Sequence, residues 1–265
     1  MYLSFCAFVY CLTLKIMARR RFYAPPSAFN FETRTVTLAA DEARHLREVL
    51  RLKIGDAVHV FDGAGREFRC IVQNARRESA ELRIDSELQP AKPESQLQLN
   101  LAVALLKGEK FDLVVQKATE LGVSKVVPVI TRYADIHLRD ESDANKRVAR
   151  WQRIALEAAK QSGRAVVPEV STPVSFESFV AGTNDAELCL MFSERDGGGL
   201  CLIPGRAARS VTALVGSEGG WSDEEIALAR KHEFHVITLG GRVLRAETAA
   251  ISATVLLQHL FGDLK

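Results

Sequence analysis

The sequence predicts an α/β protein built in two parts, a small N-terminal β domain and a larger domain in which strands and helices alternate. Apolar residues recur with period two over residues 58–84, which is typical of strands. Two prolines punctuate Glu87–Ser95, and beyond that stretch apolar strands alternate with helical patterns, which favours a mostly parallel sheet. We therefore expect a β domain over 17–88, a linker over 89–95 and an α/β domain over 96–265.

The composition limits the classes of function. With 265 residues and 47% apolar content, the chain can bury a large core. Its formal net charge is only +2, so any attraction to nucleic acid would come from local basic clusters. The five cysteines form no C-x-x-C pair and the six histidines show no metal-ligand spacing. We therefore expect reduced cysteines, no metal and a cytoplasmic protein.

The first sixteen residues are treated separately. They form an apolar run that is too short to span a bilayer, and they lack the basic segment and cleavage site of a signal peptide. We expect residues 1–16 to be a non-native or disordered extension, with the true start at Met17 and no membrane anchor.

The β domain is expected to contain one helix between Ala39 and Asp56. Leu46, Val49 and Leu50 would pack on one face of that helix. The opposite stripe is cationic and carries Arg44, Arg47 and Arg51. Two interpretations of this stripe stay open, a solvated face and a set of contacts to phosphate groups.

Further elements follow from apolar periodicity. In the β domain, Val58, Val60, Phe68, Cys70, Val72, Leu82 and Ile84 would face the core around a turn at 62–65. In the α/β domain, strands are expected over 97–103, 126–130, 188–192, 211–215 and 235–239, and helices over 111–121, 143–161, 222–231 and 246–261.

Two glycine-rich loops each follow a predicted strand and precede a predicted helix, where open α/β sheets bind ligands. The first is Gly216–Trp221, before a helix with a Ser222 cap and Glu225 three residues later. The second is Gly240–Thr248. Neither matches a phosphate-binding motif, and the neighbouring Leu239, Val243 and Leu244 suit a flat, partly apolar group such as adenine. Alternatively, both are simple turns.

Several motifs together resemble one known family. They are Met17–Pro25, His45–Arg51, Lys107–Lys110, Gln116–Val123, Gln161–Arg164 and the two glycine-rich loops. In this order they resemble the RsmE-type 16S ribosomal RNA uridine-N3 methyltransferases of the SPOUT class. One position departs from the family pattern G-P-E-G-G, because Ser217 replaces the proline. Serine restores a backbone N–H and relaxes φ, so we expect an intact but slightly more mobile loop.

The resemblance implies a PUA-like RNA-binding domain, a SPOUT-type α/β domain with a deep trefoil knot, and a homodimer that methylates 16S rRNA of the small ribosomal subunit. The cofactor would be S-adenosyl-L-methionine. Its expected contacts are Leu190, Phe192, Val215, Gly216, Glu218, Gly219, Gly220, Leu239, Gly240, Val243, Leu244, Arg245 and Thr248.

Catalytic roles are expected for three charged residues of the two loops. Arg245 would stabilise negative charge on the uracil, and Glu218 or Glu247 would accept the proton or orient the acceptor. A purely structural pairing of these groups is the alternative. The expected RNA contacts are Arg19, Arg20, Arg21, Arg44, Arg47, Arg51, Lys107, Lys110, Arg132 and Arg164.

Two other functions remain open. The chain could be a SPOUT methyltransferase that acts on another RNA, or a non-catalytic RNA-binding or ribosome-assembly factor that keeps the fold alone.

Overall fold

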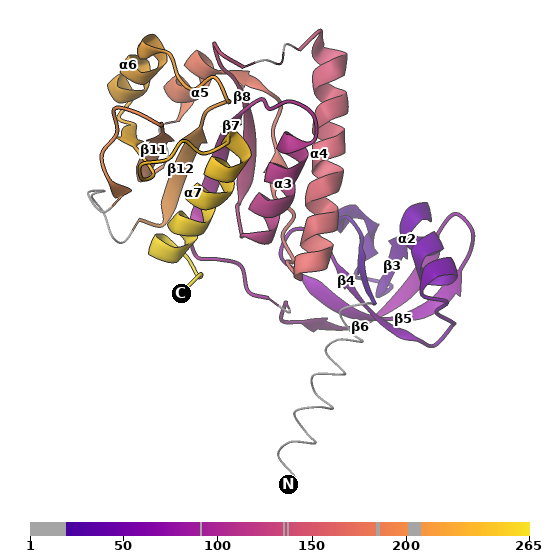
Figure 1. The fold of residues 1–265 in the computed structure, drawn as a ribbon. Coiled ribbons are helices and arrows are strands. Elements are labelled where there is room, and N and C mark those ends of the chain that lie inside the picture. The colour runs from indigo at the N-terminus through magenta and orange to yellow at the C-terminus, as the bar shows by residue number, and fades with distance from the viewer. Residues whose placement is uncertain (1–19, 91, 135, 137, 184–185, 201–207) are drawn as a thin grey trace. The chain divides into compact units, whose positions relative to one another are not determined.

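A computed structural model describes residues 20–90, 92–134, 136, 138–183, 186–200 and 208–265 (Figure 1). The expectations for residues 1–16, the Met17 start and Arg19 lie outside these ranges. The described chain divides into two compact units. Unit 1 ends at Glu94 and also takes in Ala159–Val167, whereas unit 2 comprises Ser95–Ala158 and Pro168–Lys265. The domain limits drawn from the sequence pattern, which assigned nothing beyond residue 88 to the first domain, stay a prediction.

Unit 1 is built on a six-stranded sheet in the order β1-β4-β5-β6-β3-β2. The strands are β1 Arg21–Tyr23, β2 Phe29–Asn30, β3 Thr35–Leu38, β4 Ala57–Phe61, β5 Glu67–Ala75 and β6 Ala80–Leu88. β1 pairs with β4 in parallel and the other pairs are antiparallel. The seven side chains expected to face the core are all buried, so the predicted meander is confirmed.

The predicted single helix over 39–56 is wrong in length and in one packed residue. The structure has α2 (Ala40–Arg44) followed directly by one π-helical turn, η2 (His45–Val49). The Leu50 amide donates to the His45 carbonyl, five residues earlier, so the wider turn rotates the residues that follow. Leu46 is fully buried as expected, but Val49 is 68% exposed.

A buried ion pair organises one end of the unit 1 sheet. The Arg21 guanidinium donates from Nε to Glu67 Oε1 at 3.0 Å and from Nη2 to Glu67 Oε2 at 3.2 Å. It also donates to the carbonyls of Ala159 and Arg164, which ties the returning segment Ala159–Val167 to the sheet. Burial raises the pKa of Glu67, but hydrogen bonds from His59 and Arg21 outweigh it and lower the pKa to about 2.

Unit 2 is a parallel α/β sheet, as predicted. Its order is β10-β8-β7-β12-β11-β13, with β9 paired to β8, and every pair is parallel. The strands are β7 Gln98–Ala104, β8 Lys125–Ile130, β9 Glu169–Val170, β10 Val174–Ser175, β11 Leu188–Phe192, β12 Ser210–Val215 and β13 His235–Ile237. The helices are α3 Lys110–Glu120, α4 Glu141–Ser162, α5 Phe176–Gly182, α6 Asp223–Lys231 and α7 Ala246–Phe261. The sequence pattern missed the short β9, β10 and α5.

Helices cover both faces of this sheet (Figure 1). On one face, Phe176 of α5 and Ile226 of α6 share a buried cluster with Met191 and Leu214 of the sheet. On the other face, α7 packs against α3, β7 and β12. The strands are therefore buried from both sides, which explains why they read as continuous apolar runs.

We predict that Glu67→Gln lowers the free energy of unfolding by about 3–5 kcal/mol, because it leaves the Arg21 cation buried without its counter-charge. Urea unfolding at neutral pH measures the effect. The matched control is Glu87→Gln, which breaks an exposed pair with Arg66 and should cost at most about 1 kcal/mol. Equal losses in the two variants would contradict the role assigned to the buried pair.

Candidate active site

The strand register of unit 2 brings three loops to one edge of the sheet. Phe192, the last residue of β11, is in register with Val215 at the end of β12 and with Ile237 at the end of β13. Because all three strands are parallel, the segments that follow them emerge together at the carboxyl edge. They enclose a cavity of about 390 Å³. Its lining residues are Phe192, Ser193, Glu194, Val215–Trp221, Thr238–Leu244, Ala246 and Ala249.

The first glycine-rich loop packs against the buried side chain of its own last residue, Trp221. The Trp221 indole N–H donates to the Phe192 carbonyl at 2.8 Å, and the ring is buried in the sheet–helix core. A side chain at Gly216 would begin only 3.0 Å from this indole. Ser222 caps α6 and forms the expected capping box with Glu225.

Two further glycines of this loop are required by close neighbours. A Cβ atom at Gly219 would lie 2.6 Å from the Tyr133 Cβ and 2.9 Å from the Tyr133 carbonyl oxygen. Gly220 has φ +68°, and a Cβ there would lie 2.7 Å from Glu194 Oε1. The Ser217 hydroxyl donates to the same Tyr133 carbonyl at 3.1 Å, a bond that proline would not make. The greater mobility expected from serine stays a prediction.

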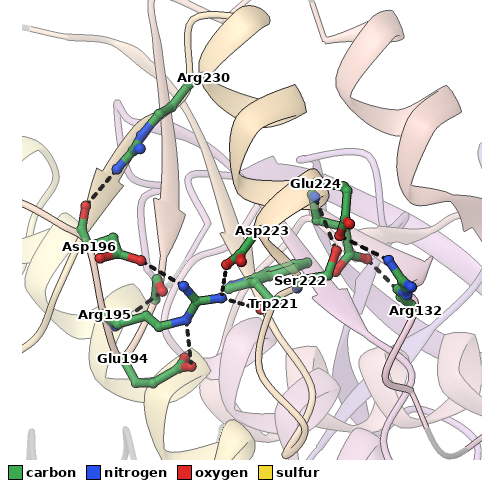
Figure 2. Close-up of polar contacts among 11 residues, drawn as sticks. Arg132, Glu194, Arg195, Asp196, Trp221, Ser222, Asp223, Glu224 and Arg230 are labelled. Carbon is green, nitrogen blue, oxygen red and sulfur yellow. Dashed lines mark hydrogen bonds and ion pairs between the residues drawn. The ribbon is translucent and has the colours of Figure 1, made fainter.

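Arg195 links the segment after β11 to the start of α6 (Figure 2). Its Nη2 lies 2.7 Å from Asp223 Oδ1 and donates to the Trp221 carbonyl at 3.0 Å. Its Nη1 lies 2.8 Å from Asp196 Oδ2. The bond to Asp223, followed by the charges of Asp223 and Asp196 and the bond to Asp196, raises the pKa of Arg195. Gly197, Gly198 and Gly199 follow directly, so this segment is a third glycine-rich stretch after a predicted strand, but neither it nor Arg195 was predicted as part of the site.

A second arginine, Arg132, bonds to the start of α6 on the other side of the first glycine-rich loop (Figure 2). The Arg132 guanidinium pairs with Glu224 at 2.9 Å, and the Arg132 backbone N–H donates to Glu225 Oε1 at 2.9 Å. The segment after β8 is thereby bonded to the first turn of α6, next to the Ser217–Tyr133 contact. Arg132 was expected to bind RNA, and its side chain remains 58% exposed.

The second loop leads from β13 to α7. Gly240 has φ +67°, and a Cβ atom added at Gly240 or Gly241 would meet no other atom within 4 Å, so this backbone borders open space. Val243 is 84% exposed. Among the predicted cofactor contacts, Leu190, Arg245 and Thr248 lie outside the cavity lining, while all the others line it. Leu190 is fully buried in β11.

Four charged residues lie close to one another, and one of them, Glu218, lines the cavity. Lys110, at the first position of α3, pairs with Glu218 of the first loop. That hydrogen bond raises the pKa of Lys110. The negative charge of Glu247 also raises this pKa, and the positive charge of Arg245 lowers it. Glu247 Oε2 is buried without a hydrogen-bond partner, whereas Arg245 caps α7 from an exposed position. The three predicted catalytic residues are thus near one another, and Lys110 belongs to the same cluster of charged side chains.

The structure separates the predicted RNA contacts into two groups. Arg21 and Arg164 are each 7% exposed and bonded inside unit 1, Arg164 to Glu94, so we withdraw both as RNA contacts. Arg44, Arg51 and Lys107 are exposed, and Arg20 and Arg47 are partly exposed. Within the described ranges, no helix is long and apolar enough to cross a membrane, and no cluster of three or more potential metal ligands occurs.

Comparison with known families identifies both units. The family model "RNA methyltransferase domain" matches residues 93–258, and "RNA methyltransferase PUA domain" matches residues 38–85. These two matches, one over the parallel α/β sheet with its glycine-lined cavity and one over the β domain, place the chain among the RNA methyltransferases. The predicted fold class, an α/β domain joined to a PUA-like β domain, is confirmed, and the trefoil knot stays a prediction.

Individual relatives narrow the class. Ribosomal RNA small subunit methyltransferase E of Synechocystis is 33% identical over 92% of this chain and 78% of its own length. The enzyme of that name from Neisseria gonorrhoeae, solved bound to S-adenosyl methionine, is 32% identical with a TM-score of 0.83, covering 93% of this chain and 99% of its own. A Legionella pneumophila methyltransferase, solved with bound cofactor SAM, is 34% identical with a TM-score of 0.84 over 92% and 99%. The chain belongs to the ribosomal RNA small subunit methyltransferase E family.

We predict that Gly219→Ala displaces the first loop and costs about 1–3 kcal/mol, because its methyl group cannot coexist with Tyr133. Hydrogen–deuterium exchange should accelerate over residues 131–134 and 216–221. Gly241→Ala is the matched control, since it adds the same methyl group in open space, and its exchange should stay unchanged. Similar exchange in both variants would refute the steric requirement.

Proposed function

We propose that this chain methylates N3 of a uridine in 16S rRNA of the small ribosomal subunit, using S-adenosyl-L-methionine. The observation that carries the proposal is the cavity lined by both glycine-rich loops at the carboxyl edge of the sheet, in a chain of this family. The resemblance further supports a trefoil knot in unit 2, a homodimer and a cytoplasmic location. Half-exposed Val255 and Leu260 on α7 are compatible with a dimer contact.

The cavity residues fit the cofactor. A volume of about 390 Å³ lies in the range of small-molecule sites. Leu239, Leu244 and Val215 supply apolar surface for a flat ring, while the backbone of Gly240 and Gly241 borders open space. Bound S-adenosyl-L-methionine would supply the methyl group. Ser193 and Glu194, which line the cavity from the segment after β11, are added to the predicted contacts.

The two nearby carboxylates have different surroundings, which divides the roles between them. Uracil N3 carries a proton that must leave before the nitrogen can accept a methyl group. Glu218 is engaged by Lys110, so its negative charge is already balanced. Glu247 has a buried oxygen without a partner, so we assign it the proton from N3. Arg245, at the N-cap of the helix that carries Glu247, would balance the charge that develops on the uracil oxygens.

The test is transfer of a labelled methyl group from S-adenosyl-L-methionine to small ribosomal subunits that lack the modification, followed by nucleoside analysis. We expect N3-methyluridine. A different methylated nucleoside, or transfer only to another RNA, would replace the proposed substrate. Cofactor binding without any transfer would favour a binding or assembly factor instead.

We predict that Arg245→Ala lowers kcat by about 10²–10³-fold, because it removes a charge-stabilising group from the transition state. The dissociation constant for S-adenosyl-L-methionine should change less than about two-fold, since Arg245 does not line the cavity. Single-turnover kinetics and calorimetry measure the two quantities. Arg209→Ala, exposed at the opposite end of β12, serves as the control. Unchanged turnover in Arg245→Ala would remove the assigned role.

We also predict that Glu247→Gln lowers kcat by about 10²–10⁴-fold, because the amide cannot take the N3 proton. Glu218→Gln keeps the side-chain shape while losing the charge that pairs with Lys110, so its larger effect should be on cofactor or RNA affinity. The same kinetic assay, run on both variants, compares the two carboxylates. A larger kcat loss in Glu218→Gln would reverse the assignment.

A further inference from the structure

Unit 1 carries an exposed aromatic ring that the proposed function has not used. Phe31 lies in the turn between β2 and β3 and is 52% exposed. Its ring stacks on Phe29, with centroids 5.9 Å apart and planes 15° apart, and it contacts Phe68 at 5.8 Å. Phe29 and Phe68 pack in the unit 1 core, so they hold the exposed ring in one orientation.

A guanidinium group lies over this ring and adds a second flat group to the patch. The Arg66 guanidinium carbon lies 4.8 Å from the centre of the Phe31 ring and 4.9 Å from that of Phe68. Arg66 Nε and Nη2 donate to the two oxygens of Glu87 at 3.0 and 2.9 Å. This pairing lowers the pKa of Glu87 and fixes the guanidinium plane. Arg66 and Glu87 remain 46% and 53% exposed.

The chemistry of the patch selects its ligand. Glu87 balances the charge of Arg66, so the patch is not suited to a phosphate group. Two exposed, oriented planes suit an uncharged flat ring, and nucleic-acid bases stack on both aromatic rings and guanidinium planes. A base inside a duplex is already stacked on both faces, so only an unpaired base can use the patch. Arg34, exposed in the same hairpin, supplies a nearby positive charge for the RNA backbone.

We propose that Phe31 and Arg66 form a stacking site for an unpaired RNA base. This inference rests on the proposed function in that it takes RNA as the ligand, and it assigns RNA recognition to the β2–β3 turn rather than to the arginine stripe of α2 and η2. Arg66 and Phe68 lie within the matched PUA domain, and β2 joins the same sheet through β3.

The test compares full-length variants in binding a short fluorescein-labelled single-stranded RNA, followed by anisotropy. Phe31→Ala should weaken binding by roughly 5- to 150-fold, the range for loss of one base–aromatic stack. Phe31→Trp should retain the affinity. Val49→Ala, which truncates another exposed apolar residue of unit 1, is the matched control and should bind like wild type. Thermal melting checks that every variant is folded.

Three results of the RNA-binding assay would overturn the stacking site. They are a Phe31→Ala affinity equal to that of Val49→Ala, wild-type affinity in Phe31→Leu, and an equal loss for duplex and single-stranded RNA. Weaker binding to small ribosomal subunits with unchanged binding to RNA would also overturn it and point to a protein partner. Methyl transfer by the wild-type chain is scored separately, so a failure of the proposed reaction is distinguishable from a failure of this site.

Discussion

The parallel, in-register pairing of β11 with both β12 and β13 is the constraint on which the site depends. Phe192, Val215 and Ile237 end their strands side by side, so three segments that are distant in the chain must turn at the same edge. The register is strongly specified, because apolar side chains on both faces of these strands are buried against helices. A shift of one residue would place core side chains on the wrong face and separate the loops.

Because three segments turn at the same edge of the sheet, the glycines of the two loops have different surroundings. At Gly216 and Gly219, a side chain would meet Trp221 or Tyr133, so these glycines permit close packing of protein on protein. At Gly240 and Gly241, the space is open, so glycine there exposes backbone to the cavity instead. Both loops line the cavity, but the glycines of the first allow contact with neighbouring protein atoms and those of the second border open space.

Periodic apolar patterns predicted much of the fold, including β11 and α7 at their observed limits. Prediction failed where an interaction is local and irregular or distant in sequence. The π-helical turn at His45–Val49 exposes Val49, and no periodicity signals it. Arg21 and Arg164 looked like surface cations, but their partners Glu67 and Glu94 lie 46 and 70 residues away. Glu194 lines the cavity because the register of β11 places it beside the other two loops, and the glycine run Gly197–Gly199 that follows it was the sequence signal that was missed.

The charged residues near the cavity also differ in whether they have a partner of opposite charge. Lys110 was expected at an RNA phosphate, yet its bond to Glu218 joins α3 to the first glycine loop. Glu218 has a cationic partner, whereas Glu247 has a buried oxygen without a hydrogen bond. Two glutamates beside one cavity are therefore not equivalent. The lysine at the start of α3 makes the difference, since it bonds to Glu218 and leaves an oxygen of Glu247 without a hydrogen bond.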